Sequence, residues 1–333
     1  MKISSRFLCA VVGACGLNSS ASADHPTAVF GSEHGGPLNT ISASSLPAGS
    51  WAAGVRTEVI DSDEFSNAKL AGVAGAGVED VHAIDQIISA SASLAYGLSD
   101  KFDIGVRIPW VLRDNIREGE IEDGEAQAHA HGDAQGIGDL VVLANYQLYS
   151  ANGFDWALQG GVKMPTGETS ESDRRERLET EFQAGSGSWD FLVGGSLGTS
   201  IGALGLHASV LYSATTEGSQ DTEIGDALQY NLAMLFNPAT GHDHGRHQHS
   251  SVLDEIRWEL MLELNGEQRW KNNVSGRSEA NSGGNVIYLS PGVRVSCAKF
   301  SAFVSFGYPM VDDSNGWQSG IDYRLSGGVA IAF

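Results

Sequence analysis

The sequence predicts an all-β fold, a transmembrane up-and-down antiparallel β-barrel of about 12 strands. Apolar and polar residues alternate in segments of about ten residues, which is the period of a strand with one apolar face. The connections between these segments are alternately short and long. After the N-terminal segment, no stretch approaches the roughly 18 consecutive apolar residues of a membrane-spanning helix, which excludes a helical membrane protein.

The first 23 residues carry the features of an export signal. Two basic residues precede an apolar run over residues 7–17, and a polar stretch then ends in Ala21-Ser22-Ala23. This order is that of a secretory signal peptide, so we predict cleavage after Ala23. The alternative is a lipoprotein signal with Cys15 as the modified residue. A membrane anchor is excluded because the run is too short to cross about 30 Å of hydrocarbon.

Residues 24–48 precede the first alternating segment and leave two arrangements open. They either form an N-terminal periplasmic arm or fold into the barrel mouth. The barrel itself is expected over residues 49–333.

The clearest alternation lies in residues 102–113. Apolar side chains from Phe102 to Leu112 occupy one face, while Asp103, Arg107 and Arg113 occupy the other. Alternate side chains of a strand point to opposite faces, whereas a helix would scatter both sets around its circumference. Twelve such segments are expected, at 49–60, 84–96, 102–113, 138–149, 154–165, 188–199, 203–214, 227–236, 255–266, 286–296, 300–308 and 322–333.

The lengths of the connections favour an outer-membrane barrel over a soluble β-sandwich, which would also show alternation. Most connections at one end have five residues or fewer, and those at the other end have 12 or more. An even number of strands places both chain ends on the short-turn, periplasmic side. Aromatic residues near the strand ends fit interface girdles: Trp51, Tyr96, Phe102, Trp156, Trp189, Tyr308 and Tyr323.

Charged residues on the less apolar face are expected to line the lumen. A Lys or Arg that faced lipid near the midplane would cost about 2–4 kcal/mol. The predicted lumenal set is Arg56, Glu58, Asp85, Arg107, Asp139, Lys163, Asp190, Arg257, Glu259, Glu263, Arg294, Asp322 and Arg324. These charges either select solutes in an open pore or form ion pairs that fill a closed interior.

Two histidine-rich stretches are candidate metal ligands, because neutral imidazole binds zinc, copper and nickel. They supply His129 and His131 in one long loop and His242, His244, His247 and His249 in another connection. Their spacing matches no closed site, so no fixed cofactor is expected. Loose capture of a divalent ion is one possibility, and a solvated polar loop is the other. The connection around residues 237–254 is unusually long for the short-turn side.

Composition and motifs exclude several other functions. The formal charge is −21, from 20 basic and 41 acidic residues, which argues against nucleic-acid binding. The six long loops hold 26 acidic and 8 basic residues, so the excess acid gathers on the outer rim and favours cationic or neutral solutes. Gly194 to Gly198 match G-x-S-x-G, but they lie inside a predicted strand instead of the strand-to-helix elbow that this motif needs. His207 with Ser209 could suggest a lipid hydrolase of barrel type, but polar residues that line a pore explain this pair better. We therefore predict no enzyme.

Eight short motifs together resemble the phenol-degradation meta-pathway (MetA-pathway) family of outer-membrane β-barrel transporters. In order along the chain, these are Gly36–Thr40, Leu46–Gly49, Leu94–Gly97 followed by Asp100, Arg107–Pro109, Gly136–Leu140, Lys163–Gly167, Gly185–Ser188 and Ser290–Gly292. The resemblance implies a barrel related to channels for hydrophobic compounds, and it supplies no ligand residues. The C-terminal aromatic Phe333 is a common feature of exported barrels, and it implies recognition by the barrel-assembly machinery.

The expected function is passive uptake or efflux of a small solute, hydrophobic or aromatic compounds being one class, in the outer membrane of a Gram-negative cell. The expected partners are outer-membrane lipid and the solute, with no nucleic acid. One alternative is a metal-linked outer-membrane protein that captures divalent cations through its His-rich loops. The other is a structural or interaction barrel with a closed lumen.

Overall fold

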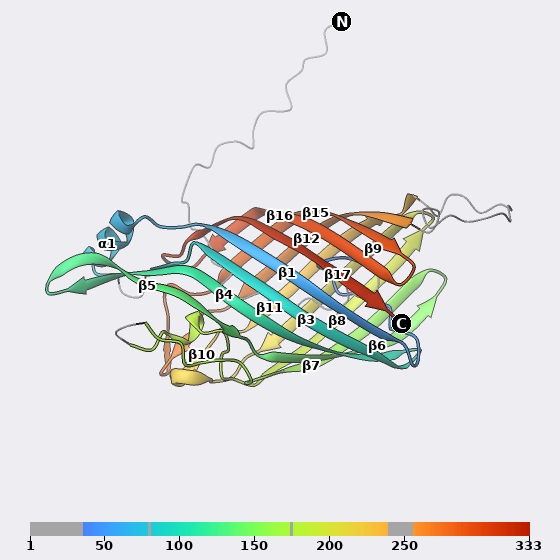
Figure 1. Ribbon diagram of the computed structural model, residues 1–333, viewed down its shortest axis with the longest axis horizontal. Coiled ribbons are helices and arrows are strands. Elements are labelled where there is room, and N and C mark those ends of the chain that lie inside the picture. The colour runs from blue at the N-terminus through green and yellow to red at the C-terminus, as the bar shows by residue number, and fades with distance from the viewer. Residues whose placement is uncertain (1–35, 79–80, 174–175, 239–255) are drawn as a thin grey trace, which may run out of the picture.

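The computed structural model describes residues 36–78, 81–173, 176–238 and 256–333. Twelve antiparallel strands form a closed barrel, which confirms the predicted fold (Figure 1). They are β1 (Trp51–Asp63), β3 (Gln86–Ser99), β4 (Phe102–Glu122), β6 (Leu140–Ala151), β7 (Phe154–Met164), β8 (Asp190–Ile201), β9 (Leu204–Ala214), β11 (Ala227–Phe236), β12 (Ile256–Arg269), β15 (Gly284–Cys297), β16 (Phe300–Ser314) and β17 (Gly320–Ala332). The barrel closes where β1 pairs with β17, from Ala52 opposite Ala332 to Asp63 opposite Gly320.

The two faces of the strands follow the predicted alternation. On β4, Ile104 and Ile108 are exposed on the outside, whereas Asp103 and Arg107 are buried on the inside. On β12, the outer face is an exposed apolar row from Trp258 to Leu264. This distribution suits a wall with lipid outside and polar groups inside.

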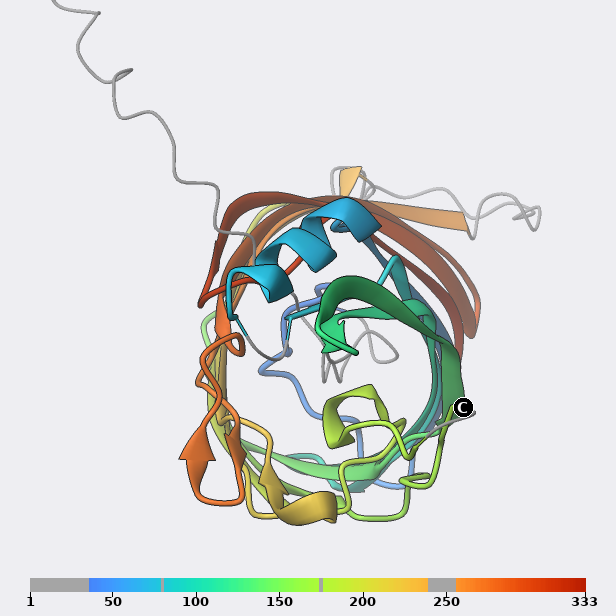
Figure 2. The same cartoon turned by 90° about the vertical axis from the view of Figure 1, so that its left-hand side faces the viewer.

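The two ends of the barrel differ in the length of their connections. The described connections at one end are short turns, while the other end carries α1 (Asn67–Gly75), η2 (Thr180–Phe182), η3 (Ser219–Asp221) and the short strands β2 (Val81–Ala83), β10 (Thr222–Glu223), β13 (Asn273–Val274) and β14 (Arg277–Ser278) (Figures 1 and 2). Within the described residues, no helix is long and apolar enough to cross a membrane.

The segment expected as a loop at 114–137 is instead a hairpin that extends beyond the barrel (Figure 1). The second half of β4 pairs with β5 (Glu125–Ile137), and Asp123-Gly124 form the two-residue turn between them. Both turn residues have positive φ, 54° and 84°, as a type I′ hairpin turn requires. The hairpin packs against α1, where Gly119 lies so close that an added Cβ would be 2.5 Å from the carbonyl oxygen of Leu70.

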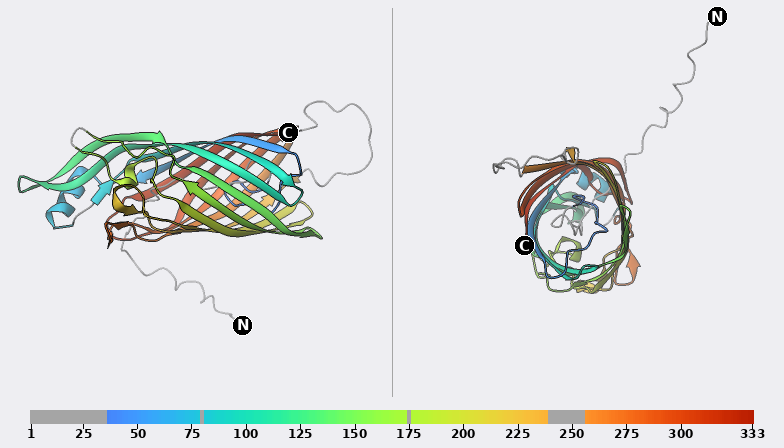
Figure 3. Two further views of the ribbon diagram at one scale, coloured as in Figure 1. Left: turned by 90° about the horizontal axis from the view of Figure 1, so that it is seen from below. Right: turned by 90° about the vertical axis from the view of Figure 1, so that its right-hand side faces the viewer.

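Residues 36–50, here called the inner segment, run inside the barrel at its short-turn end (Figure 3, right). Residues 38–43 are all buried. The inner segment leads directly into β1, where the backbone N–H of Trp51 donates to the carbonyl oxygen of Phe333 at 2.6 Å. The sequence left the position of this segment open, and the structure places its residues 38–43 inside the wall.

Candidate functional site: a lumen with two inserted segments

Charged side chains of the barrel wall bind the beginning of the inner segment. Glu263, which is 1% exposed, accepts hydrogen bonds from the backbone N–H groups of Leu38 at 2.7 Å and Asn39 at 3.0 Å. It also accepts one from the hydroxyl of Thr40 at 2.8 Å. Arg56 donates to the carbonyl oxygen of Leu38 at 2.9 Å and to Oδ1 of Asn39 at 2.6 Å. A buried carboxylate and a guanidinium thus replace the water that this backbone would otherwise need.

Polar side chains from other strands bind the rest of the inner segment. Ser209 accepts from the N–H of Ile41 at 3.2 Å, and Ser196 donates to the carbonyl oxygen of Ser42 at 3.1 Å. Further along, Asp103 accepts from the N–H of Leu46 at 3.0 Å. Ser196 belongs to the G-x-S-x-G match and lies within β8, where it contacts the inner segment.

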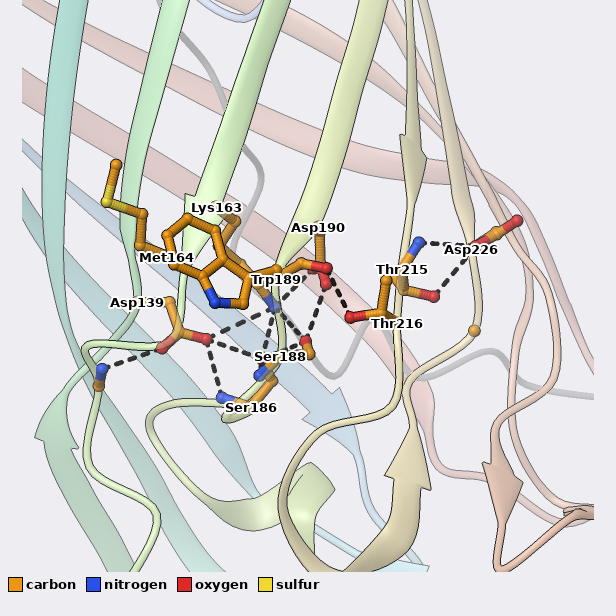
Figure 4. Close-up of polar contacts among 12 residues, drawn as sticks. Asp139, Lys163, Met164, Ser186, Ser188, Trp189, Asp190, Thr215, Thr216 and Asp226 are labelled. Carbon is orange, nitrogen blue, oxygen red and sulfur yellow. Dashed lines mark hydrogen bonds and ion pairs between the residues drawn. The ribbon is translucent and has the colours of Figure 1, made fainter.

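The connection between β7 and β8, described over residues 165–173 and 176–189, folds back toward the barrel interior and is here called the inward loop (Figure 2). Asp139 holds both ends of this loop. Its Oδ1 accepts from the N–H of Gly167 at 2.9 Å, and its Oδ2 accepts from the N–H of Ser186 at 2.9 Å and its hydroxyl at 2.8 Å. Lys163 supplies the compensating charge, with Nζ 2.6 Å from Oδ2 of Asp190 and 3.5 Å from Oδ2 of Asp139 (Figure 4).

Apolar side chains of the inward loop fill the lumen near the long-loop end. Leu178 and Phe182 are buried in a cluster with lumenal residues of the wall. The wall members of this cluster include Ile60, Ile87, Val111, Val286, Tyr288 and Ile321. The lumen is therefore not uniformly polar. A ring of apolar wall residues contacts the inward loop, nearer the long-loop end than the charged side chains that bind the inner segment.

A cavity of about 140 Å³ lies beneath the inward loop, between residues 183–186 and the wall. Its lining combines the charged groups of Arg107, Arg113 and Lys163 with apolar side chains. The apolar lining includes Pro109, Val111, Val141, Leu192, Leu211 and Ile224. Ile41 of the inner segment packs in one cluster with Val141, Leu192 and Leu211, so the cavity lies between the two inserted segments.

The predicted lumenal residues divide into three groups in the structure. Arg56, Glu58, Arg107, Asp139, Asp190, Glu263, Arg294 and Arg324 are buried, and Asp85, Lys163 and Glu259 are partly buried. Arg257 and Asp322 are exposed.

Asp322 departs from the alternation because of a β-bulge. Asp61 pairs with Tyr323 and Ser62 pairs with Ile321, so Asp322 has no residue opposite it on β1. The bulge turns Ile321 into the lumenal apolar cluster and leaves Asp322 exposed. A single extra residue of this kind cannot be recognised from the hydrophobic pattern of the sequence.

Sequence reasoning missed the apolar part of the lumen. Val111 and Tyr288 lie on inward faces, although the alternation predicts polar side chains on these faces. One signal was present, because Pro109 and Val111 interrupt the polar face of β4.

The histidine predictions have different outcomes. His242, His244, His247 and His249 lie outside the described residues. His129 and His131 lie on β5, in the hairpin beyond the barrel, where both approach Asp173 of the inward loop.

Four of the eight short sequence motifs lie together where the inward loop joins the wall. Gly138 donates its N–H to the carbonyl oxygen of Pro109 at 2.8 Å. An added Cβ on Gly167 would be 2.7 Å from Cα of Gly185, so these two backbones can approach only as glycines. Asp139 and Lys163 complete the contact, and residues 107–109, 136–140, 163–167 and 185–188 thus form one anchor.

The remaining motifs meet around the inner segment. An added Cβ on Gly97 would be 2.0 Å from the carbonyl oxygen of Pro47, and Gly49 donates its N–H to the carbonyl oxygen of Gly97 at 2.8 Å. An added Cβ on Gly292 would be 2.6 Å from Cδ1 of Leu38. The motifs therefore mark the docking of the two inserted segments.

Comparison with known protein sequences identifies one family. Residues 81–245 match the profile of the family described as "Putative MetA-pathway of phenol degradation", which confirms the resemblance that the motifs predicted. No curated protein sequence matches the chain significantly.

A fold shared with a solved structure is seen at low sequence identity, and two other solved structures align less well. The COG4313 outer membrane channel from Pseudomonas putida F1 superposes with a TM-score of 0.62 at 13% identity, over 89% of this chain and 100% of that chain. LpxR from Salmonella typhimurium has a TM-score of 0.41 at 11% identity, over 84% and 99% of the two chains. The TodX deltaS2S3 mutant monoaromatic hydrocarbon channel has 0.44 at 7%, over 86% and 91%.

Proposed function

We propose that this barrel, which resembles the MetA-pathway family, is an outer-membrane channel for a neutral, single-ring compound that carries a hydroxyl group. The observation that carries the proposal is the cavity between the inner segment and the inward loop. Its volume of about 140 Å³ is close to that of an engineered cavity of about 150 Å³ that binds benzene.

The two sides of the cavity lining support this class of solute. Val141, Leu192 and Leu211 offer an apolar surface for a ring. Arg107 and Lys163 lie on the same lining, together with Asp139 and Asp190, so a solute hydroxyl would meet a polar, charged side of the cavity. The acidic rim concentrates cations and repels anions, so a neutral solute meets no electrostatic barrier there.

Passage through the lumen requires the two inserted segments to move aside. The inner segment lies between the cavity and the short-turn end, and the inward loop lies between the cavity and the long-loop end. Both are docked through hydrogen bonds, in which the carboxylates of Glu263 and Asp139 take a main part. Transient opening of either end admits a solute without unfolding the wall.

Export and membrane assembly complete the proposal. Residues 1–23 direct export, and Phe333 presents the terminal aromatic to the assembly machinery of a Gram-negative outer membrane. Fractionation of expressing cells tests this part, since recovery of the protein as soluble periplasmic material contradicts it.

Current through the purified protein in a planar bilayer tests the channel. We expect small single-channel currents that fall when benzyl alcohol is added and occupies the cavity. Val111→Trp should fill the cavity and remove this block, whereas Ile108→Trp, on the outward face of the same strand, should leave it intact.

A silent protein would contradict the channel. The decisive result is no current from the native protein and none from Glu263→Gln or Asp139→Asn, which loosen the two inserted segments. That outcome supports a structural barrel with a closed lumen instead.

A further inference from the structure

The hairpin beyond the barrel brings two histidines to one carboxylate of the inward loop. His129 and His131 are two positions apart on β5, so both side chains lie on the same face of the strand. Oδ2 of Asp173 is 2.8 Å from Nδ1 of His131 and 3.3 Å from Nε2 of His129. Their ring centroids are 4.7 Å apart and their planes nearly perpendicular, at 84°.

We propose that His129, His131 and Asp173 form a binding site for one divalent transition-metal ion of the zinc class. One ligand atom from each residue lies within 4.8 Å of the others. Bonds of about 2.0–2.1 Å in tetrahedral geometry space two ligand atoms roughly 3.4 Å apart. The spacing of the three atoms is therefore close to that of a coordination shell and needs only small side-chain shifts.

The second nitrogen of each imidazole also faces a carboxylate. Nε2 of His131 is 3.0 Å from Oε2 of Glu118, and Nδ1 of His129 is 3.8 Å from Oε1 of Glu120. Metal-bound histidines commonly donate their other N–H to a carboxylate, which fixes the tautomer and orients the ring. Both glutamates come from β4, the partner strand in the hairpin, so the orienting groups are built into the same element.

The donor set selects the class of ion. Two imidazole nitrogens and one carboxylate oxygen suit zinc, copper or nickel, whereas calcium and magnesium prefer shells made of oxygen. Three protein ligands leave a fourth position for water, as in exchangeable or catalytic zinc sites rather than closed structural ones.

Proton binding alone explains this arrangement less well than a metal ion does. One ring nitrogen of His129 and one of His131 approach the same oxygen of Asp173. The side chains of His131 and Asp173 are each only 7% exposed. Two imidazolium ions at this distance would repel each other, whereas one metal ion lets both rings bind as neutral ligands.

A neighbouring trio makes the assignment testable in detail. His82, Glu179 and Glu181 also place one ligand atom each within 4.8 Å of one another. Nε2 of His82 is 3.7 Å from Oε2 of Glu179 and 3.8 Å from Oε1 of Glu118. Only one of its three ligands is an imidazole, so zinc should prefer the site with His129 and His131.

Isothermal titration with zinc alone, on the full chain in detergent, tests the site. The starting protein carries His242, His244, His247 and His249 all replaced by alanine, which removes the other His-rich stretch. We expect one equivalent of zinc to bind this protein. His131→Ala or Asp173→Asn should weaken binding at least tenfold, and Asp123→Asn at the exposed hairpin turn should leave it unchanged.

A conservative variant and a gel assay separate loss of the ligand from loss of folding, and a spectrum identifies the ligands. His131→Gln keeps the volume and polarity of the side chain, and the unchanged heat-modifiable mobility of the barrel on a gel checks its fold. Zinc-edge X-ray absorption should show two imidazole ligands in the starting protein.

Two outcomes overturn the site. One is the absence of binding in the starting protein. The other is binding that survives His131→Ala and disappears with His82→Ala, which assigns the ion to the neighbouring trio. Neither outcome bears on the channel, which the conductance measurement tests separately.

Discussion

Replacement of Glu263 by glutamine should release the inner segment from the lumen. The carboxylate accepts from two backbone N–H groups and one hydroxyl of residues 38–40, and it is 1% exposed. A hydrogen bond to a charged group is worth about 1 kcal/mol more than one to a neutral group. Loss of the charge at three donors therefore destabilises docking by about 3 kcal/mol, which corresponds to roughly a 100-fold larger undocked fraction.

Hydrogen exchange measured by mass spectrometry reports this fraction directly. Exchange of the amides of residues 38–46 should accelerate roughly 100-fold in Glu263→Gln, because these amides exchange when the segment leaves its docked position. Glu267→Gln is the matched control, since Glu267 lies on the same strand and the same face but bonds Arg269 at 2.9 Å.

The comparison between the two variants decides whether Glu263 holds the segment. If exchange in Glu263→Gln equals that in Glu267→Gln and in the native protein, the hydrogen bonds of Glu263 do not determine docking. A faster exchange spread over the whole wall would instead show general loss of barrel stability.

Three further predictions follow from the inward loop and the hairpin. Asp139→Asn should weaken the loop anchor by about 1–3 kcal/mol, seen as faster proteolysis within residues 165–189, and a rate equal to that of Asp123→Asn would contradict it. In metal-free protein the pKa of His131 is raised to about 8, mainly by its hydrogen bond to Glu118, with Asp173 adding to the effect against burial. Because this pKa lies above the unfolded value of about 6.5, its stabilising effect is complete below that pH and is lost as pH rises through about 8. NMR titration should show that Glu118→Gln lowers the midpoint, and an unchanged midpoint would refute this cause. If zinc binds between the hairpin and the inward loop, it should reduce channel current, and EDTA should restore the current; equal currents would separate the metal site from the channel.

The wall of the barrel could be read from the sequence because its signal is local. Alternation along one strand fixes which side chains face outward, as Ile104 and Asp103 show on neighbouring positions of β4. All 12 expected segments correspond to strands of the wall. The hairpin of β4 and β5 was missed because its two strands carry few apolar residues, although Asp123-Gly124 is a recognised turn signal.

The position of the inserted segments depends on contacts between distant parts of the chain. Leu38 and Glu263 are 225 residues apart, and His131 and Asp173 are 42 apart. No local pattern records such a pairing, since a buried glutamate in an alternating strand looks the same whether it binds a solute, an arginine or a backbone N–H.

The sequence by itself determined the barrel, the orientation of its faces, the difference in loop length between its two ends and the acidic rim. Each of these follows from the order of side chains along one strand or loop. Only the tertiary structure decided that residues 38–43 and the part of the inward loop with Leu178 and Phe182 enter the lumen, that a ring-sized cavity remains between them, and that Asp173 meets two histidines. The physical reason is that closure of the wall brings distant groups within hydrogen-bonding distance, and the buried backbone must then take its partners from whichever side chains closure has placed there.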